Sequence, residues 1–480
     1  MNPLRKLALT ASLLALAACT VGPDHAPPAT PAAAAGPFLG AGHPALADAE
    51  PDADWWRLYR DPVLDGLVQD ALAHNSDVRV AAANLARARA LLRESRSQRL
   101  PQTGLSAGAA YGRAAENDVP PGADREDWQF DAGFDVAWEL DLFGRVSRSV
   151  EASRADADAA EAVRDAVRVA VAAETARAYA DAAAAAERLA VAERSLALIE
   201  RTLVVTTRRF EAGRGTRLDV ARVTSLREQQ RASLPPLRAE RDGALFRLAT
   251  LTGRAPAALP PAAGARRTIL QLDRPIPIGD GRTLLARRPD VREAERRLAA
   301  ETARIGVATA DLYPRITLGG SIGSTAGSVG NLFTGGPLSW LLGPLINWSF
   351  PNQEAVRARI RAQEASAEAA LARFDGAVLG ALEETETALS VYRHALDRRA
   401  ALAGAQEAAA RAAEIERARL RAGRADSLAV LDAERTLAEA EAELSLADAR
   451  IVTAQVDLFR ALGGGWQEEV AVAGAGDQPG

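Results

Sequence analysis

The segment WQFDAGFDVAWELDL, residues 128–142, alternates between apolar and polar side chains along almost its whole length. A period of two is typical of a β-strand with one apolar and one wet face. Trp128 and Trp138 share the apolar face. A strand that rises about 3.3 Å per residue and tilts about 40° separates them by roughly 25 Å along the membrane normal. That is the height of the apolar band of an outer-membrane barrel, so the two rings are predicted to mark its lipid interfaces.

Three further segments share this alternation, and they are 103–111, 316–322 and 338–350. The last of them carries Trp340 and Trp348 on its apolar side, so we add both rings to the predicted aromatic girdle. We expect two hairpins, 102–142 and 315–350. Four strands are too few to close a barrel, because the smallest barrels have about eight, so several chains must contribute. The alternative is the edge of an ordinary β-sandwich whose apolar face covers a core.

The wet face of the segment 128–142 is acidic, and its acids are Asp131, Asp135, Glu139 and Asp141. Inside a closed barrel these carboxylates would make the lumen negative and favour the passage of cations. The alternative is that they only solvate a wide lumen.

The chain is a tandem repeat with two gapless registers. An offset of 213 (290 minus 77) pairs Leu72, Asp77, Val78, Arg79, Leu85, Pro101 and Leu105 with Leu285, Asp290, Val291, Arg292, Leu298, Pro314 and Leu318. An offset of 210 (348 minus 138) pairs Trp138, Glu174, Gly213, Arg214, Leu218, Val220, Leu248 and Gly253 with Trp348, Glu384, Gly423, Arg424, Leu428, Val430, Leu458 and Gly463. The two halves are therefore predicted to be one fold written twice.

Each repeat is expected to contain a helix, a hairpin, a long helix and a return helix. The long helices are predicted over 145–212 and 353–422, and the return helices over 216–252 and 426–462. At 1.5 Å per residue, the first long helix would extend about 100 Å. Gly213 and Gly423 are suited to end the long helices as left-handed C′ residues. Pro235-Pro236 should break the first return helix, whereas the equivalent Ser445-Leu446 would leave the second intact.

The N-terminus predicts an anchor. Arg5 and Lys6 precede an apolar stretch that is too short to cross a bilayer, as in a secretory signal peptide. Leu16-Ala17-Ala18-Cys19 resembles a bacterial lipobox, which makes Cys19 the expected site of acylation and joins the chain to outer-membrane lipid. The expected segments are a signal peptide (1–18), a lipidated leader (19–56), a first repeat (57–253), a linker (254–281), a second repeat (282–466) and a tail (467–480).

Composition excludes several function classes. Aromatic residues make up only 5% of the chain, and long Ala-rich stretches favour extended helices over globular domains. The net charge of -5 argues against nucleic acid as a partner. Cys19 is the single cysteine and the four histidines are scattered, so we expect neither a metal site nor a cofactor, and no enzyme. No later segment has 18 or more continuous apolar residues, so we expect no membrane-spanning helix.

The order of several motifs on this twofold repeat carries a family resemblance. The motifs are Cys19-Thr20-Val21-Gly22-Pro23-Asp24, Asp54-Trp55-Trp56, Arg209-Phe210-Glu211-Ala212-Gly213, Leu420-Arg421-Ala422-Gly423, Leu431-Asp432-Ala433 and Ala461-Leu462-Gly463-Gly464-Gly465-Trp466. They resemble the TolC-like outer-membrane efflux factors, in particular the OprM/NodT lipoprotein branch. The resemblance implies a mainly α protein with a membrane part, a homotrimer whose twelve-stranded β-barrel continues as a long α-helical periplasmic barrel. It also implies a periplasmic adaptor (membrane fusion) protein and an inner-membrane pump of the resistance-nodulation-division type as partners.

The resemblance further implies a closed periplasmic gate just after the second helix–helix turn, at Leu428, Asp432 and Arg435. These positions are i, i+4 and i+7 on one helix face, so three copies could converge on the pore. The alternative for Asp432 and Arg435 is a solvated pair within one helix. Two other functions share the same features, namely the exit channel of a type I protein secretion system and a structural envelope lipoprotein.

Overall fold

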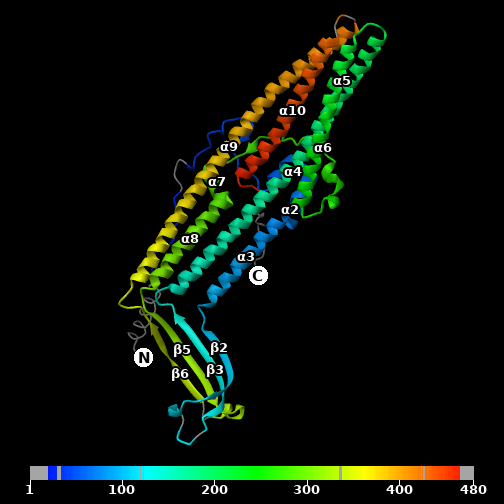
Figure 1. The fold of residues 1–480 in the computed structure, drawn as a ribbon. Helices are drawn as coiled ribbons and strands as arrows, with labels where there is room; N and C mark the ends of the chain where they lie inside the picture. Colours follow the sequence, from blue (N-terminus) through cyan, green and yellow to red (C-terminus); the bar gives the residue numbers. More distant parts are fainter. Residues whose placement is uncertain are drawn as a thin grey trace, which may run out of the picture. The chain divides into compact units, whose positions relative to one another are not determined.

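The computed structural model describes residues 20–29, 34–118, 120–122, 124–334, 338–422, 424 and 427–464. The described chain forms two compact units (Figure 1). Of the described residues, those within 20–28, 84–161 and 293–375 form the sheet unit, and those within 29–83, 162–292 and 376–464 form the hairpin unit. Each unit draws on both sequence repeats. Cys19, Gly423 and the tail 467–480 lie outside the described residues.

One antiparallel sheet dominates the sheet unit, with its strands in the order β2-β3-β5-β6 (Figure 1). The strands are β2 (Gln102–Arg113), β3 (Glu126–Leu140), β5 (Arg315–Ala326) and β6 (Leu338–Asn347). Trp128 lies opposite Tyr111, and Trp138 opposite Leu318, so apolar side chains gather on one face, as the alternation predicts. That face stays exposed in the single chain, with Leu105 at 86% and Leu342 at 68%.

The strand register places Trp340 differently from the other predicted girdle residues. Trp340 lies opposite Ile322, and Ile322 lies opposite Phe134. Phe134 is between Trp128 and Trp138 on β3, so Trp340, the third residue of β6, is level with the middle of β3 rather than with either of its tryptophans. We therefore leave Trp340 out of the girdle proposal, which keeps Trp128, Trp138 and Trp348.

Helices lead into and out of each hairpin. Those before the strands are α2 (Pro62–His74), α3 (Ser76–Ser97), α7 (Gly281–Arg287) and α8 (Pro289–Ala310). Those after them are α4 (Arg145–Glu211), α5 (Arg217–Ala232), α6 (Leu234–Leu251), α9 (Glu354–Arg421) and α10 (Ser427–Ala461). In the part of the chain that the structure describes, no helix combines the length and the apolar character that a membrane span needs.

Local sequence explains where these helices end. Gly213 has φ +72, and the amide of Arg214 donates to the carbonyl of Arg209 over 2.8 Å, which closes α4 with a left-handed cap. Thr216 and Asp219 then form a capping box that starts α5. The predicted break is confirmed, because α5 ends and α6 begins beside Pro235, while α10 is unbroken.

Contacts in the two halves repeat with the sequence offsets. Asn75 Nδ2 donates to the Leu251 carbonyl over 3.0 Å, and at the equivalent place Arg288 Nη1 donates to the Ala461 carbonyl over 2.9 Å. The same holds at the base of the sheet. Trp138 Nε1 donates to the Arg99 carbonyl over 3.0 Å, and Trp348 Nε1 donates to the Leu312 carbonyl over 3.1 Å. The repeat is therefore one of tertiary contacts as well as of sequence.

The main core lies in the hairpin unit and joins leader, linker and both repeats. Trp55 of the short helix η2 (Trp55–Tyr59) is fully buried and stacks on Phe459 of α10 with the ring centroids 4.7 Å apart. Strand β1 (Leu46–Ala47) of the leader pairs in parallel with β4 (Ile276–Pro277) of the linker. Short 3-10 helices also occur between the longer elements. The first β-hairpin loop contains η3 (Glu116–Asp118), the linker contains η4 (Pro256–Ala258) and η5 (Pro261–Gly264), and η6 (Val329–Phe333) follows β5.

Candidate functional site

Asp141 belongs to a helix cap rather than to the wet face of the sheet. Strand β3 ends at Leu140, and the Asp141 carboxylate accepts hydrogen bonds from the amides of Val146 and Ser147 over 2.8 and 2.7 Å. Those two N–H groups lie in the first turn of α4. The first N–H groups of a helix have no carbonyl acceptor within the helix, so the Asp141 carboxylate takes that place. The interpretation of Asp141 as a lumen acid is therefore corrected.

Glu139 lies on the wet face, but its charge is balanced. Arg145 donates to both carboxylate oxygens over 2.7 and 2.6 Å. This hydrogen bond with Glu139 raises the pKa of Arg145 above its usual value, against the opposing effect of burial. A bidentate pair of this kind presents little net charge to a passing ion.

Of the four predicted acids, Asp131 and Asp135 remain on the wet face. Asp131 accepts from Thr325 Oγ1 over 2.8 Å, and the opposing strand gives both carboxylates room. A Cβ added at Gly104 would lie 4.0 Å from Asp135 Oδ2, and one at Gly108 would lie 3.9 Å from Asp131 Oδ2. Only two of the four predicted lumen acids therefore remain, and both face small residues on the neighbouring strand.

Two leucines share that wet face, and the sequence analysis missed them. Leu341 of β6 lies opposite Ser321 of β5, and Ser321 lies opposite Asp135 of β3. In the same way, Leu345 lies opposite Thr317, and Thr317 lies opposite Glu139. Both are well exposed, at 67% and 61%. Strand β6 has leucines on both faces, and the alternation that assigned Trp340 and Trp348 to the apolar side is the signal that could have placed these two leucines on the wet side.

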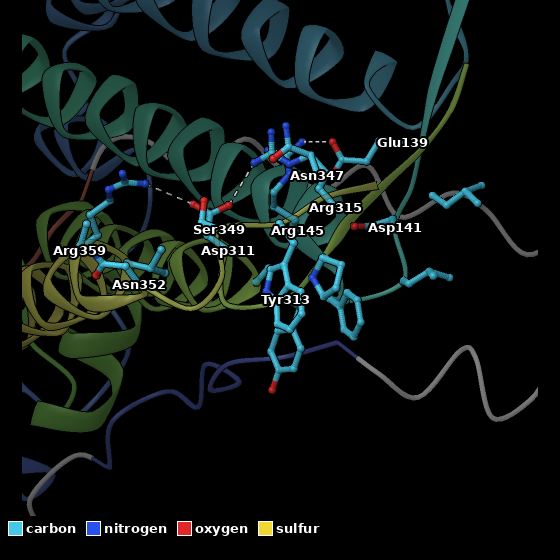
Figure 2. Close-up of a pocket in the computed structure, with 18 residues that line it drawn as sticks. Glu139, Asp141, Arg145, Asp311, Tyr313, Arg315, Asn347, Ser349, Asn352 and Arg359 are labelled. Atoms are coloured by element: carbon cyan, nitrogen blue, oxygen red, sulfur yellow. Dashed lines mark hydrogen bonds and ion pairs between the residues drawn. The ribbon is translucent and has the colours of Figure 1, made fainter. Parts of the chain in front are cut away.

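A cavity of about 270 Å³ opens where the sheet meets the helices. Figure 2 shows arginines converging there on the carboxylates of Glu139 and Asp311. Asp311 pairs with Arg315 at 3.1 Å and with Arg359 at 3.8 Å. The cluster is nearly charge-balanced and offers no nucleophile with a neighbouring base. Within the described residues, no three His, Cys, Asp or Glu side chains gather as a metal site would require.

The leader is held against the sheet unit directly after Cys19. Arg148, whose side chain is only 5% exposed, donates to the carbonyls of Val21 and Gly22 and to Asp24 Oδ1, the last over 2.6 Å. The backbone of Gly22, at φ +91, lies so close to Gly306 that an added Cβ would come within 2.4 Å of its Cα. No spacing in the sequence indicated this clamp, because it joins segments more than 120 residues apart.

The predicted gate residues lie together on α10. Leu428 is 45% exposed, and Arg435 Nη2 pairs with Asp432 Oδ1 at 2.8 Å within the same helix. In the single chain the two charges therefore form the intrahelical pair that the sequence left open as the alternative. Their convergence with other copies is a property of an assembly and stays a prediction.

Comparisons with known proteins agree on one family. The family model described as "Outer membrane efflux protein" matches the chain twice, over residues 67–254 and 281–464. The chain is 32% identical to outer membrane protein OprJ of Pseudomonas aeruginosa, with 95% of each chain covered. It is 31% identical to the probable efflux pump outer membrane protein TtgC of Pseudomonas putida, with 97% of each covered. A solved structure of the outer-membrane channel OprN aligns with a TM-score of 0.87 and 39% identity, covering 94% of this chain and 100% of that one.

Proposed function

Because the chain belongs to the outer membrane efflux protein family, we propose that it forms the exit duct of a tripartite pump. It is an outer-membrane efflux channel that extends into the periplasm, and it passes its substrate unchanged, so it is not an enzyme. A duct of this kind stores no energy of its own. Its partners are therefore a periplasmic adaptor and an inner-membrane pump, which we propose to be of the resistance-nodulation-division type.

Small molecules are the proposed cargo. Relatives of this chain are named for antibiotic, toluene and solvent efflux and for the export of pyoverdine. Deletion of the gene should lower the resistance of cells to such compounds and restore their accumulation, while the set of secreted proteins stays unchanged. Loss of a secreted protein with unaltered drug resistance would instead favour the type I secretion function.

The observation that carries the duct is the four-stranded sheet with an exposed apolar face. Its outer strands are β2 and β6, and a sheet of four strands cannot close on itself. Three copies would supply the twelve strands of a closed barrel, with Trp128 near one lipid interface and Trp138 and Trp348 near the other. The wet faces would then line the lumen, where Asp131 and Asp135 of each copy favour cations.

Two further elements belong to the proposal. Cys19 would carry the lipid anchor, and the Arg148 clamp on the leader supports this, since it holds Val21 and Gly22, two and three positions after Cys19, against the sheet unit. Leu428, Asp432 and Arg435 would close the periplasmic end where three copies of α10 meet. Their exposure on one face of the helix supports such a meeting.

Single-channel recording tests the gate. Replacing both Asp432 and Arg435 by alanine should raise the conductance of the closed channel severalfold, because opposed charges between neighbouring helices are lost three times. The matched control replaces Glu407 and Arg411, an equally exposed intrahelical pair on α9, and should leave conductance unchanged. Equal conductance in the gate variant, the control and the unmodified protein would show that the constriction lies elsewhere.

A further inference from the structure

The seam between α9 and α10 is built mostly from alanine. Near the tip it contains Ala409, Ala413 and Leu437, with Ala410, Ala433 and Ala440 packed against them. Helices α4 and α5 form the first helical hairpin, and α9 and α10 form the second. At the positions equivalent to Ala409, Ala413 and Ala433, the first helical hairpin has Ile199, Leu203 and Val223. Large branched side chains interlock in one arrangement, whereas methyl groups fit several registers almost equally well. The second helical hairpin therefore lacks large interlocking side chains that would fix the position of α10 along α9.

An ion pair with a buried carboxylate and a half-buried guanidinium stands in the same seam. Arg417 of α9 donates to both carboxylate oxygens of Glu434 of α10, over 2.5 and 2.8 Å. The Glu434 side chain is only 4% exposed, and Ser195, Leu198 and Ile199 of α4 lie beside it. The first helical hairpin has Thr207 and Thr224 at these positions, and the Thr224 hydroxyl donates to the carbonyl of Val220 in its own helix. Only the alanine-rich hairpin of the two has the Arg–Glu pair at this place.

Glu434 sits on the face of α10 opposite to the proposed gate. Val430, Glu434 and Leu437 form the buried stripe, at 1%, 4% and 5% exposure. The gate residues Leu428, Asp432 and Arg435 each precede a member of that stripe by two positions. At 3.6 residues per turn, two positions correspond to about 200° around the helix. When α10 is rotated so that Glu434 faces α9, the gate residues therefore face outward. If α10 slipped by one residue against α9, the gate residues would point about 100° away from that direction.

We propose that the Arg417–Glu434 pair sets the register of α10 against α9 and so aims the gate side chains at the pore. Both are positioning residues, and the inference rests on the proposed gate. An ion pair with a buried member contributes little net stability, because desolvation of that charge offsets the attraction, and fixing register is the best-attested use of such pairs. An Arg fork that grips both oxygens of one carboxylate accepts a single alignment of the two helices.

The chain allows a direct measurement of this alignment. Cys19 is its single cysteine, and lipid would occupy that thiol, so one introduced cysteine can carry a spin label. Ala429 is exposed beside the gate. Distances between labels at Ala429→Cys in the assembled channel then report how the tips of α10 are arranged.

The main variant replaces Arg417 by methionine and Glu434 by leucine, which keeps the seam filled and folded. Its thermal stability should be unchanged or higher, while the label distances broaden and the closed-channel conductance rises severalfold. Arg417→Lys keeps the charge but loses the fork, so its label distances should lie between those of the unmodified protein and of the double variant. The matched control applies the same two replacements to Arg398 and Glu443, an exposed pair that joins the same helices at 2.9 Å, and should change neither readout.

Three outcomes separate the possibilities. Lower stability with unmodified distances and conductance would overturn the inference and leave the pair a simple stabiliser. Altered distances with unmodified conductance would support the register role and refute the gate at Leu428, Asp432 and Arg435. Altered distances and conductance in the control as well would also overturn the inference, because any pair between the helices would then have the same effect.

Discussion

Asp135 and Asp141 stand six positions apart with the same parity, yet their carboxylates have different surroundings. Replacing Asp141 by alanine should lower the free energy of unfolding by about 0.5–2 kcal/mol, because two amides of α4 lose their acceptor. Ion selectivity should stay as it is. Thermal unfolding and the reversal potential in a salt gradient measure the two effects.

The matched variant is Asp135→Ala. It should leave stability nearly unchanged and reduce the preference for cations, since this carboxylate points to the wet face among small residues. If the Asp141 variant altered selectivity as much as the Asp135 variant, the lumen interpretation of Asp141 would be restored.

The anchor can be tested through primary amines. Lys6 is the only lysine of the chain, so cleavage before Cys19 leaves the α-amine of residue 19 as the one primary amine. Acylation of that amine would make the mature protein inert to amine-reactive dyes. Cys19→Ser should abolish lipid labelling and cleavage, and the uncleaved chain should then react with the dye through Lys6 and its N-terminal α-amine. Normal lipid incorporation in this variant would contradict the assignment.

At the scale of elements, the two tryptophans at the base of the sheet offer a test of the repeat. Trp138→Phe and Trp348→Phe should each cost about 0.5–1.5 kcal/mol, since each loses one hydrogen bond from its indole to the end of the preceding helix. Trp340→Phe is the control, because Trp340 lies level with Phe134 of β3 and away from the base of the sheet, and it should cost less. Chemical denaturation in detergent measures all three, and unequal losses for Trp138 and Trp348 would show that the repeated contacts are not equivalent in energy.

Sequence predicted these elements where one local signal was enough. Alternation indicated the strands, a proline pair the break after α5, and Gly213 the end of α4. Alternation failed at Asp141. This residue continues the odd-numbered polar positions of β3, although it lies after the end of the strand and caps α4. Alternation also failed at Trp340, because the level of β6 depends on two successive registers that alternation leaves undefined.

At the scale of the molecule, the offsets of 213 and 210 predicted two copies of one fold but not the units into which they pack. Each unit mixes both repeats, since the sheet unites both hairpins and the main core unites leader, linker and α10. The clamp of Arg148 on the leader joins segments more than 120 residues apart, and the pairs of Asp311 with Arg359 and of Arg417 with Glu434 each join two separate helices or their ends. A single sequence carries no periodic signal for such contacts, so they had to be seen.

The last prediction concerns the assembly of three chains. Two adjacent leucines of β6 serve as test position and control. Leu342 and Leu341 are almost equally exposed in the single chain, at 68% and 67%. Leu342 pairs with Gly320 on the apolar face, whereas Leu341 shares the wet face with Asp135. In a water-soluble sheet, arginine at either position would be tolerated alike. In a barrel of three chains, Leu342→Arg would face lipid and cost about 2–4 kcal/mol per chain near the bilayer midplane, while Leu341→Arg would face water.

Native mass analysis in detergent, together with membrane fractionation, reads out this difference. The unmodified chain and Leu341→Arg should be recovered from the outer membrane as trimers, and Leu342→Arg should be depleted there because three copies would bring three charges into the bilayer. Equal recovery of the two variants would refute the lipid-facing assignment of the apolar side. A stable folded monomer as the main species of the unmodified chain would refute the shared barrel, because four strands leave β2 and β6 without the partners that closure requires.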